Sequence, residues 1–158
     1  MNGHSTWLTP AAFEKLSSEL DDLKTEGRRR MESRLADARS HGDLRENGDY
    51  DAAKNDQGMM EARIRQLEAI LANAEVREAS DDGMVGIGSI VTVVDRSGTE
   101  MEYFVATPEN KIPGFLLASP SGPLGKALLG ARQGDSITYE APGGKFTFTI
   151  KDVRPFRG

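Results

Sequence analysis

The feature that most constrains the fold is a heptad pattern in the middle of the chain. Its positions recur in steps of four and three residues without a fault: Ala53, Gln57, Met60, Ile64, Leu67, Leu71 and Ala74. This spacing is the seam of a coiled coil, in which one helix covers its apolar stripe with another. The chain therefore has to supply a second long helix.

That helix is predicted upstream, starting at Thr9 and Pro10. Threonine can cap free N–H groups, and proline at the first helical position loses no hydrogen bond. An apolar pattern follows and slips in phase near Gly27: Phe13, Leu16, Leu20, Leu23, then Met31, Leu35 and Ala38. We expect one helix of about thirty residues, roughly 45 Å long, with a weakened or bent midpoint. Because only about eight residues around Gly42 separate the two patterns, the helices should form an antiparallel hairpin.

Beyond a polar break at Ser80–Gly83 the pattern changes to that of short strands. The expected strands are Ser89–Val94, Glu102–Ala106, Phe115–Ala118, Ser136–Glu140 and Phe146–Val153. One short helix is expected near Pro123–Leu129, and Pro142-Gly143-Gly144 is typical of a hairpin turn. The sequence thus predicts an α+β fold, with an antiparallel two-helix coiled-coil arm over residues 1–79 and a small antiparallel β-sheet domain with one short helix over residues 80–158.

Composition excludes several classes of function. The chain has 158 residues, no cysteine and a net charge of −5. Disulfides and thiolate metal sites are therefore impossible, and a reducing, cytoplasmic location is expected. No apolar signal core or membrane span is found, so no membrane partner is expected. The negative charge argues against a general nucleic-acid coat, although five arginines crowd one segment: Arg28, Arg29, Arg30, Arg34 and Arg39.

The link between the helices, HGDLRENGDY at positions 41–50, is unusually acidic. Gly42 could end the first helix, and Asp43 with Glu46 could open the second as a capping box. This leaves Asp49 and Asp51 unexplained. Crowded carboxylates also suit a hard cation such as Mg²⁺, but two are too few to hold it tightly without ligands from another molecule. Both interpretations stay open from the residues alone.

The same stretch carries a resemblance to a known family. The segment ADARSHGDLRENGDYDAAKNDQGMMEARIRQLEAIL, with SPSGPLGKALLGARQGD and APGGKFTFTIKDV further on, closely resembles the bacterial Gre transcript-cleavage factors. Their tip has the pattern H-G-D-L-x-E-N-x-x-Y-x-A-A. The resemblance spans essentially the whole chain, and its charge balance is more like that of GreA than of GreB.

The resemblance implies a transcription elongation factor. Its coiled coil would enter the secondary channel of bacterial RNA polymerase and stimulate Mg²⁺-dependent cleavage of backtracked RNA by the polymerase, so the chain would not itself be an enzyme. Asp43 and Glu46 would assist a Mg²⁺ ion shared with the polymerase and bound weakly by the isolated protein. Asn47 and Tyr50 would position these acids, and Arg39 and Lys54 would contact the nascent RNA 3′ end. The second half would be an FKBP-like docking domain, and the protein a monomer.

Some positions depart from the family pattern. Arg28–Met31 lacks a proline expected in this stretch of the first helix, Gly48 and Asp49 replace a small residue and a glutamate, and Asp51 adds a charge. Two rival functions are less well supported by the residues. A Gre-like inhibitor of the same channel is disfavoured by the intact Asp43 and Glu46, and an FKBP-type prolyl isomerase is disfavoured because fold alone carries no activity.

Overall fold

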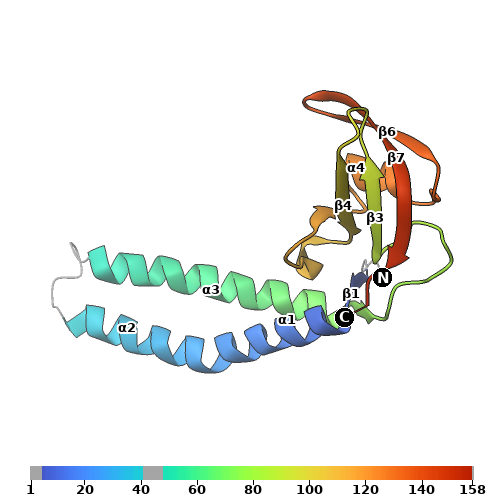
Figure 1. The fold of residues 1–158 in the computed structure, drawn as a ribbon. Coiled ribbons are helices and arrows are strands. Elements are labelled where there is room, and N and C mark those ends of the chain that lie inside the picture. Colours follow the sequence, from blue (N-terminus) through green and yellow to red (C-terminus); the bar gives the residue numbers. More distant parts are fainter. Residues whose placement is uncertain (1–4, 41–47, 158) are drawn as a thin grey trace. The chain divides into compact units, whose positions relative to one another are not determined.

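The computed structural model describes residues 5–40 and 48–157 (Figure 1). The chain divides into two compact units. Residues Phe13–Ala74 belong to the first, a helical arm, whereas Thr6–Ala12 and the residues from Glu75 onward belong to the second, a β-sheet unit. The division at residues 79 and 80 stays a prediction about independently folding domains. In the described residues, no helix has the length and apolar character that crossing a membrane requires.

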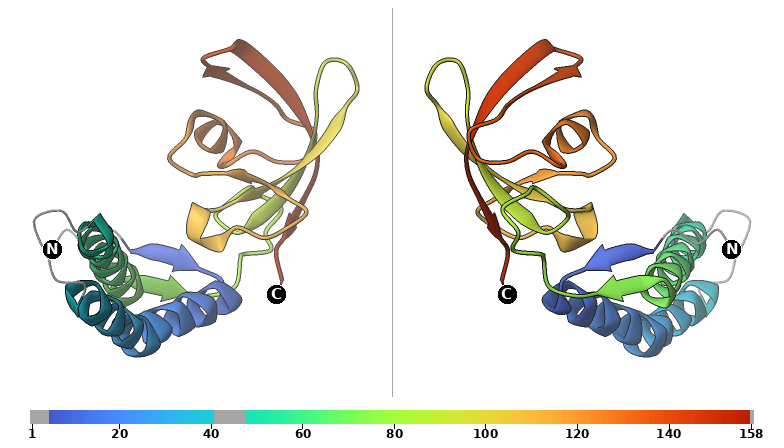
Figure 2. Two further views of the ribbon diagram at one scale, coloured as in Figure 1. Left: turned by 90° about the vertical axis from the view of Figure 1, so that its left-hand side faces the viewer. Right: turned by 90° about the vertical axis from the view of Figure 1, so that its right-hand side faces the viewer.

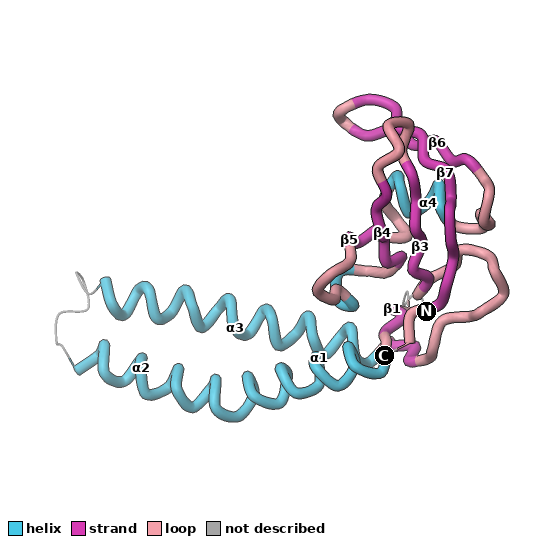
Figure 3. Tube along the Cα trace, viewed as in Figure 1, coloured by secondary structure: helices cyan, strands magenta, loops and turns pink. Residues whose placement is uncertain are grey.

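Helices follow one another along the arm. They are α1 (Pro10–Asp22), a π-helical turn (Leu23–Gly27), α2 (Arg28–Ser40) and α3 (Gly48–Ala72). The two helices of the hairpin, α2 and α3, run side by side in the ribbon and in the tube (Figures 1 and 3). At the start of α1, the Thr9 hydroxyl accepts a hydrogen bond of 2.9 Å from the Ala12 N–H, which confirms the predicted cap.

The π-helical turn explains the slip in the apolar pattern of the first helix. A π-turn holds one extra residue per turn, so it shifts the stripe that follows without ending the helix. From this turn, the Thr25 hydroxyl donates to the Asp21 carbonyl of α1 at 2.9 Å. The predicted irregular midpoint is therefore confirmed. Gly27 ends the π-turn, and a Cβ placed on it would lie 3.3 Å from the Met60 sulfur of α3.

Replacing Gly27 with alanine is expected to stabilise the arm by up to about 1 kcal/mol, because glycine is a poor helix former. The only tight contact is with the end of a flexible methionine side chain, which can move by a few tenths of an ångström. Thermal melts followed by helical circular dichroism would measure the change. A lower melting temperature would show that Met60 is held in place, or that the π-turn depends on glycine.

The second unit is built on a five-stranded sheet. Its strands are β3 (Ser89–Val94), β4 (Glu100–Val105), β5 (Leu116–Ala118), β6 (Ser136–Ala141) and β7 (Gly144–Pro155), in the order β5-β4-β3-β7-β6. All neighbours are antiparallel except β4 and β5, which are parallel. A 3-10 turn (Pro108–Asn110) and the short helix α4 (Pro123–Leu128) complete it. The expected strands and helix are confirmed, and each of their ends differs from the expected residue by no more than two positions.

Both faces of the sheet carry apolar clusters because successive side chains of a strand point to opposite faces. On one face, Val91, Val93 and Val105 pack with Leu128 of α4, which lies against that face (Figure 2). On the other face, Phe104 packs in a second cluster that includes Trp7. Strand β3 is therefore buried on both sides, and it forms the centre of the unit.

Two short strands were not predicted from the sequence. They are β1 (Thr6–Leu8) and β2 (Ala74–Val76), which pair with each other. The side chain of Asn110 fixes β1, accepting from the Thr9 N–H and donating to the Trp7 carbonyl, both at 2.9 Å. Trp7 is only 4% exposed and meets the Phe104 ring edge to face, with centroids 6.4 Å apart. The N-terminal residues are thus part of the core of the β-sheet unit.

Close packing around Trp7 requires a glycine at position 88. Its φ angle of +95° lies in the left-handed region, which side-chain-bearing residues rarely adopt. A Cβ there would also lie 2.6 Å from the Ala79 Cβ and 2.9 Å from the Trp7 ring. Gly88 therefore lets the backbone approach both residues.

Candidate functional site at the end of the arm

Three of the predicted site residues, Asp43, Glu46 and Asn47, lie outside the described residues. The structure describes the helix ends on both sides of them, where α2 ends at Ser40 and α3 begins at Gly48. The remaining predicted residues are Arg39 on α2, and Tyr50 and Lys54 on α3. The structure therefore describes the part of the candidate site that lies on these two helix ends.

Small residues allow the two helices to approach each other at this end. Ala38 is 4% exposed and Ala53 is fully buried. Both belong to the apolar patterns that predicted the hairpin, and a short side chain at the seam leaves room for the facing helix. The predicted seam thus extends to the last turns before the tip segment.

Arg39 and Tyr50 join the two helix ends directly. The Arg39 guanidinium donates from Nη2 to the Tyr50 hydroxyl at 3.2 Å, and its central carbon lies 5.5 Å from the centre of the tyrosine ring. This hydrogen bond lowers the pKa of Tyr50 below its ordinary value. A cation near an aromatic ring is attracted by the ring's negative face. The pair links the last turn of α2 to the first turn of α3.

Lys54 takes part in a different contact. Its amino group donates to the Gln57 side chain at 3.0 Å, one turn further along α3. Lys54 and Arg39 are both exposed, so their charged groups are accessible to solvent. The structure thus places two exposed cations close to the tip segment, one on each helix.

The two extra acids of the tip have a structural role. Asp49 and Asp51 lie in the first turn of α3 and are exposed. Negative side chains in this turn interact favourably with the free N–H groups and the positive end of the helix dipole. Such an interaction contributes about 0.3–1 kcal/mol at a surface position. Helix stability therefore accounts for these two acids without a metal.

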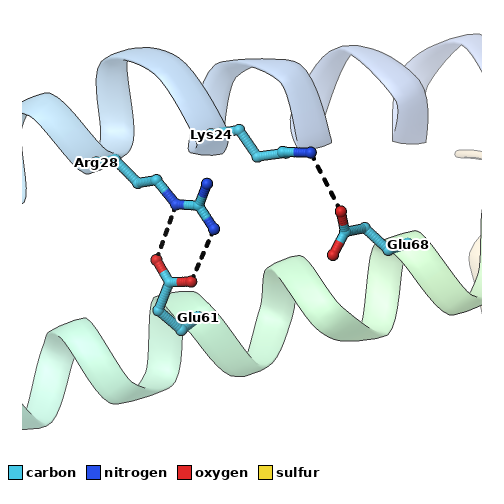
Figure 4. A network of polar contacts seen from close by, with 4 residues as sticks. All are labelled: Lys24, Arg28, Glu61 and Glu68. Atoms are coloured by element: carbon cyan, nitrogen blue, oxygen red, sulfur yellow. Dashed lines mark hydrogen bonds and ion pairs between the residues drawn. The ribbon is translucent and has the colours of Figure 1, made fainter.

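Ion pairs between the helices extend along the arm behind the tip. Arg28 forms a two-pronged pair with Glu61, with distances of 3.0 Å and 2.9 Å, and Lys24 pairs with Glu68 at 3.2 Å (Figure 4). The hydrogen bond from Arg28 lowers the pKa of Glu61, so this carboxylate stays ionised at neutral pH. Two-pronged geometry fixes direction as well as distance, and it makes the arm more rigid.

Other members of the arginine-rich segment are also paired. Arg34 bonds to Asp56 of α3 at 2.7 Å, and Arg29 bonds to Glu26 at 2.7 Å. The crowding of arginines seen in the sequence therefore serves mainly to join the two helices. These pairings offset part of the positive charge that would otherwise be available to a nucleic-acid backbone.

Among residues 5–40 and 48–157, no three histidine, cysteine or acidic side chains converge as a metal site. Carboxylates are suitable ligands for Mg²⁺, but the metal assignment to Asp43 and Glu46 falls outside the described residues. It stays a prediction.

Comparison with known proteins decides the family. The protein-family model "Transcription elongation factor, N-terminal" matches residues 6–76 of this chain. A second family model, "Transcription elongation factor, GreA/GreB, C-term", matches residues 80–155. The chain belongs to the GreA/GreB family of transcription elongation factors.

Relatives of this GreA/GreB-family protein match over nearly their whole length. Transcription elongation factor GreA of Saccharopolyspora erythraea is 43% identical over 157 residues, covering 97% of this chain and 96% of the relative. GreA of Mycolicibacterium smegmatis is 43% identical over 160 residues, with the same coverage. Among solved structures, GreA factor homolog 1 of Thermus thermophilus is 31% identical and covers 96% of this chain and 99% of that chain, with a TM-score of 0.45.

One contact at the candidate site of this protein was not predicted from the sequence. Tyr50 was expected to position the tip acids and Arg39 to contact RNA, but their mutual hydrogen bond was not foreseen. A signal was present, because residues equally far from the middle of the link face each other in an antiparallel hairpin. Arg39 and Tyr50 come close to this condition, and so, less closely, do Arg34 and Asp56.

Proposed function

We propose that this protein binds bacterial RNA polymerase and stimulates the polymerase's own cleavage of backtracked RNA. The observation that carries the proposal is the braced hairpin, whose helix α3 has 25 residues and is about 37 Å long. Such an arm can enter a narrow channel and carry the Asp43–Glu46 segment into it. Full-length similarity to GreA proteins supports this assignment.

The two carboxylates are the chemical part of the proposal. Asp43 and Glu46 add negative charge at the tip, and they complete a cation site whose other ligands belong to the polymerase. When bound, the shared Mg²⁺ supplies a more acidic water as attacking group and offsets charge that develops on the phosphate. Because this chain contributes only part of the ligand set, it acts as an activator and is not the nuclease.

Described neighbours of the tip have supporting roles. Tyr50 and Arg39 hold the ends of α2 and α3 together. Lys54 offers an exposed ammonium group that can meet the phosphates of the extruded RNA 3′ end. Asn47 is proposed to orient the acids. The β-sheet unit docks on the polymerase, and the protein acts in the cytoplasm as a monomer.

The purified protein alone is expected to leave RNA intact. Two tip carboxylates without further fixed ligands make an incomplete Mg²⁺ site. In the decisive experiment, labelled RNA is incubated with Mg²⁺ and either the protein, a halted polymerase complex, or both. Cleavage well above that of the halted complex is expected only when both are present.

Two other outcomes would contradict the proposal. Cleavage of free RNA by highly purified protein would make the chain itself a nuclease. Slower cleavage and slower nucleotide addition by the polymerase, with no released RNA fragment, would assign it instead to the channel inhibitors. The released fragment is therefore the measurement that separates activation from occupation of the channel.

A further inference from the structure

We propose that the β-sheet unit carries a separate groove that binds an extended, acidic segment of a partner protein through one or two aliphatic side chains. The groove has a volume of about 500 Å³. Its lining comes from the β3–β4 turn, where Asp95, Arg96 and Ser97 lie, and from strands β4, β6 and β7. This inference rests on the β-sheet unit alone and does not depend on the proposed action of the arm.

Aromatic side chains form the floor and wall of the groove. They come from strand β4 and from the neighbouring strands β6 and β7, namely Tyr103, Tyr139, Phe146 and Phe148. Phe148 is buried, whereas Phe146 is 40% exposed although it lies next to the apolar core. Clefts of about 300–1,000 Å³ with mainly apolar linings and a few polar groups are typical ligand sites. The exposed Phe146 ring is thus available to an apolar partner group.

Stacking among the rings favours an aliphatic occupant over a nucleic-acid base. The Tyr139 and Phe146 rings stack with centroids 5.5 Å apart, and Tyr139 also packs on Phe148 at 5.6 Å. These rings already use faces on which a base would stack in a single-strand binding site. A branched aliphatic side chain needs only a ring edge and the remaining exposed face.

Tyr103 provides a hydrogen-bond donor in the groove. Its hydroxyl has a weak acceptor in the Met101 sulfur, 4.0 Å away. Burial raises the pKa of Tyr103, and the nearby Tyr139 adds to the effect, so the hydroxyl keeps its proton at neutral pH. A backbone carbonyl is a stronger acceptor than a thioether. An extended peptide would present such a carbonyl next to its apolar side chain.

Charge at the rim selects an acidic segment. Arg96 and Lys145 border the groove. The third charged residue, Asp95, accepts hydrogen bonds from the Ser97 N–H, the Ser97 hydroxyl and the Thr99 N–H, at 2.6–2.9 Å. Its carboxylate is therefore committed to its own turn. Lys145 forms a long, exposed pair with Glu140 at 3.6 Å, and Arg96 donates a long hydrogen bond to the Thr147 hydroxyl at 3.4 Å. Because both contacts are long and exposed, the charge that these two residues offer to a partner is positive.

A peptide titration of the full-length protein tests the proposal. The probe is a blocked peptide with two central leucines flanked by glutamates, and its matched twin has lysines in place of the glutamates. Amide shifts in ¹⁵N-labelled protein should move at Phe146, Tyr139 and Arg96. Binding of the lysine twin should be weaker by about tenfold or more, because two favourable charge contacts become repulsive.

Variants make the test specific. Phe146→Ala should weaken binding of the glutamate peptide about fivefold or more, whereas Leu116→Ala should leave it unchanged. Leu116 is a suitable control because it is 50% exposed and lies on β5, outside the groove. Tyr103→Phe, which removes only the hydroxyl, should weaken binding about threefold. Dispersed amide spectra would verify that each variant is folded.

Several results would overturn the proposal. These are equal binding of the two peptides, no shifts up to the solubility limit, and full binding by Phe146→Ala. A uridine oligonucleotide that moved the same amides more strongly would assign the groove to RNA. Shifts at these amides that changed with protein concentration alone would assign it to a second copy of the chain.

Discussion

Replacing Asp43 with asparagine is expected to abolish most of the stimulation of RNA cleavage while leaving the protein folded and able to bind polymerase. Asparagine has the size of aspartate and caps a helix about equally well, so stability should change by well under about 1 kcal/mol. The substitution removes the negative charge that we propose helps to recruit the Mg²⁺ shared with the polymerase. Glu46→Gln makes the same change of charge at the second acid, and it should have the same effect.

Cleavage in halted polymerase complexes across a Mg²⁺ titration, with thermal melts, would measure both properties. Residual activity of the variants should rise with Mg²⁺, and either variant should compete with the wild type for polymerase. Glu32→Gln is the matched control, since it makes the same change at an exposed position of α2. Full cleavage by Asp43→Asn at low Mg²⁺ would show that Asp43 is only a helix cap.

Truncation of Trp7 to alanine is expected to destabilise the β-sheet unit by about 3–5 kcal/mol, as for other buried aromatic side chains. Trp7 is 4% exposed and packs on Phe104 of strand β4, which is distant in the sequence. For the same reason, a fragment of residues 84–158 should be much less stable than the same residues in the full chain. Such a fragment lacks both Trp7 and Ala79, which belong to one apolar cluster.

Hydrogen exchange separates this effect from any change in the arm. Amides of β3, β4 and β7 should lose protection by about two orders of magnitude or more in Trp7→Ala, whereas amides in the middle of α3 should change little. Phe13→Ala provides a control, because Phe13 is 36% exposed and belongs to the arm. Unchanged protection in the sheet would mean that the N-terminal segment is not part of its core.

Local patterns made most of the fold predictable. The heptad seam from Ala53 to Ala74 required a partner helix, and the short link required an antiparallel hairpin. Strand β3 was predicted with the bounds that the structure gives it. Its side chains are apolar toward both faces and polar turns border it, so the signal lies within a few neighbouring residues.

The pairing of β1 with β2 could not be predicted in this way. Each has only three residues, too few to show a periodicity, and the whole arm separates them in the sequence. Trp7 between Thr6 and Leu8 is a composition typical of strands, but it does not identify the partner. Long-range packing decided this part of the fold.

For similar reasons, only some features of the candidate site can be predicted from the sequence. The pair between Arg39 and Tyr50 follows from hairpin geometry once the centre of the link is known. The first-turn position of Asp49 and Asp51 explains their charge through the helix dipole. The action of Asp43 and Glu46 depends on ligands from another molecule, which no local pattern in this chain contains. It stays a prediction.

Topologically, the arm is an insertion within the β-sheet unit. The chain contributes Thr6–Ala12 to that unit, leaves it for the whole length of the arm, and returns at Glu75. Such an inserted cassette can change length without altering the core that hosts it. Adding one heptad to each helix would extend the arm by about 10 Å and preserve the seam. Evolution or protein engineering can therefore adjust how far the acidic segment reaches in heptad steps while keeping the same host unit.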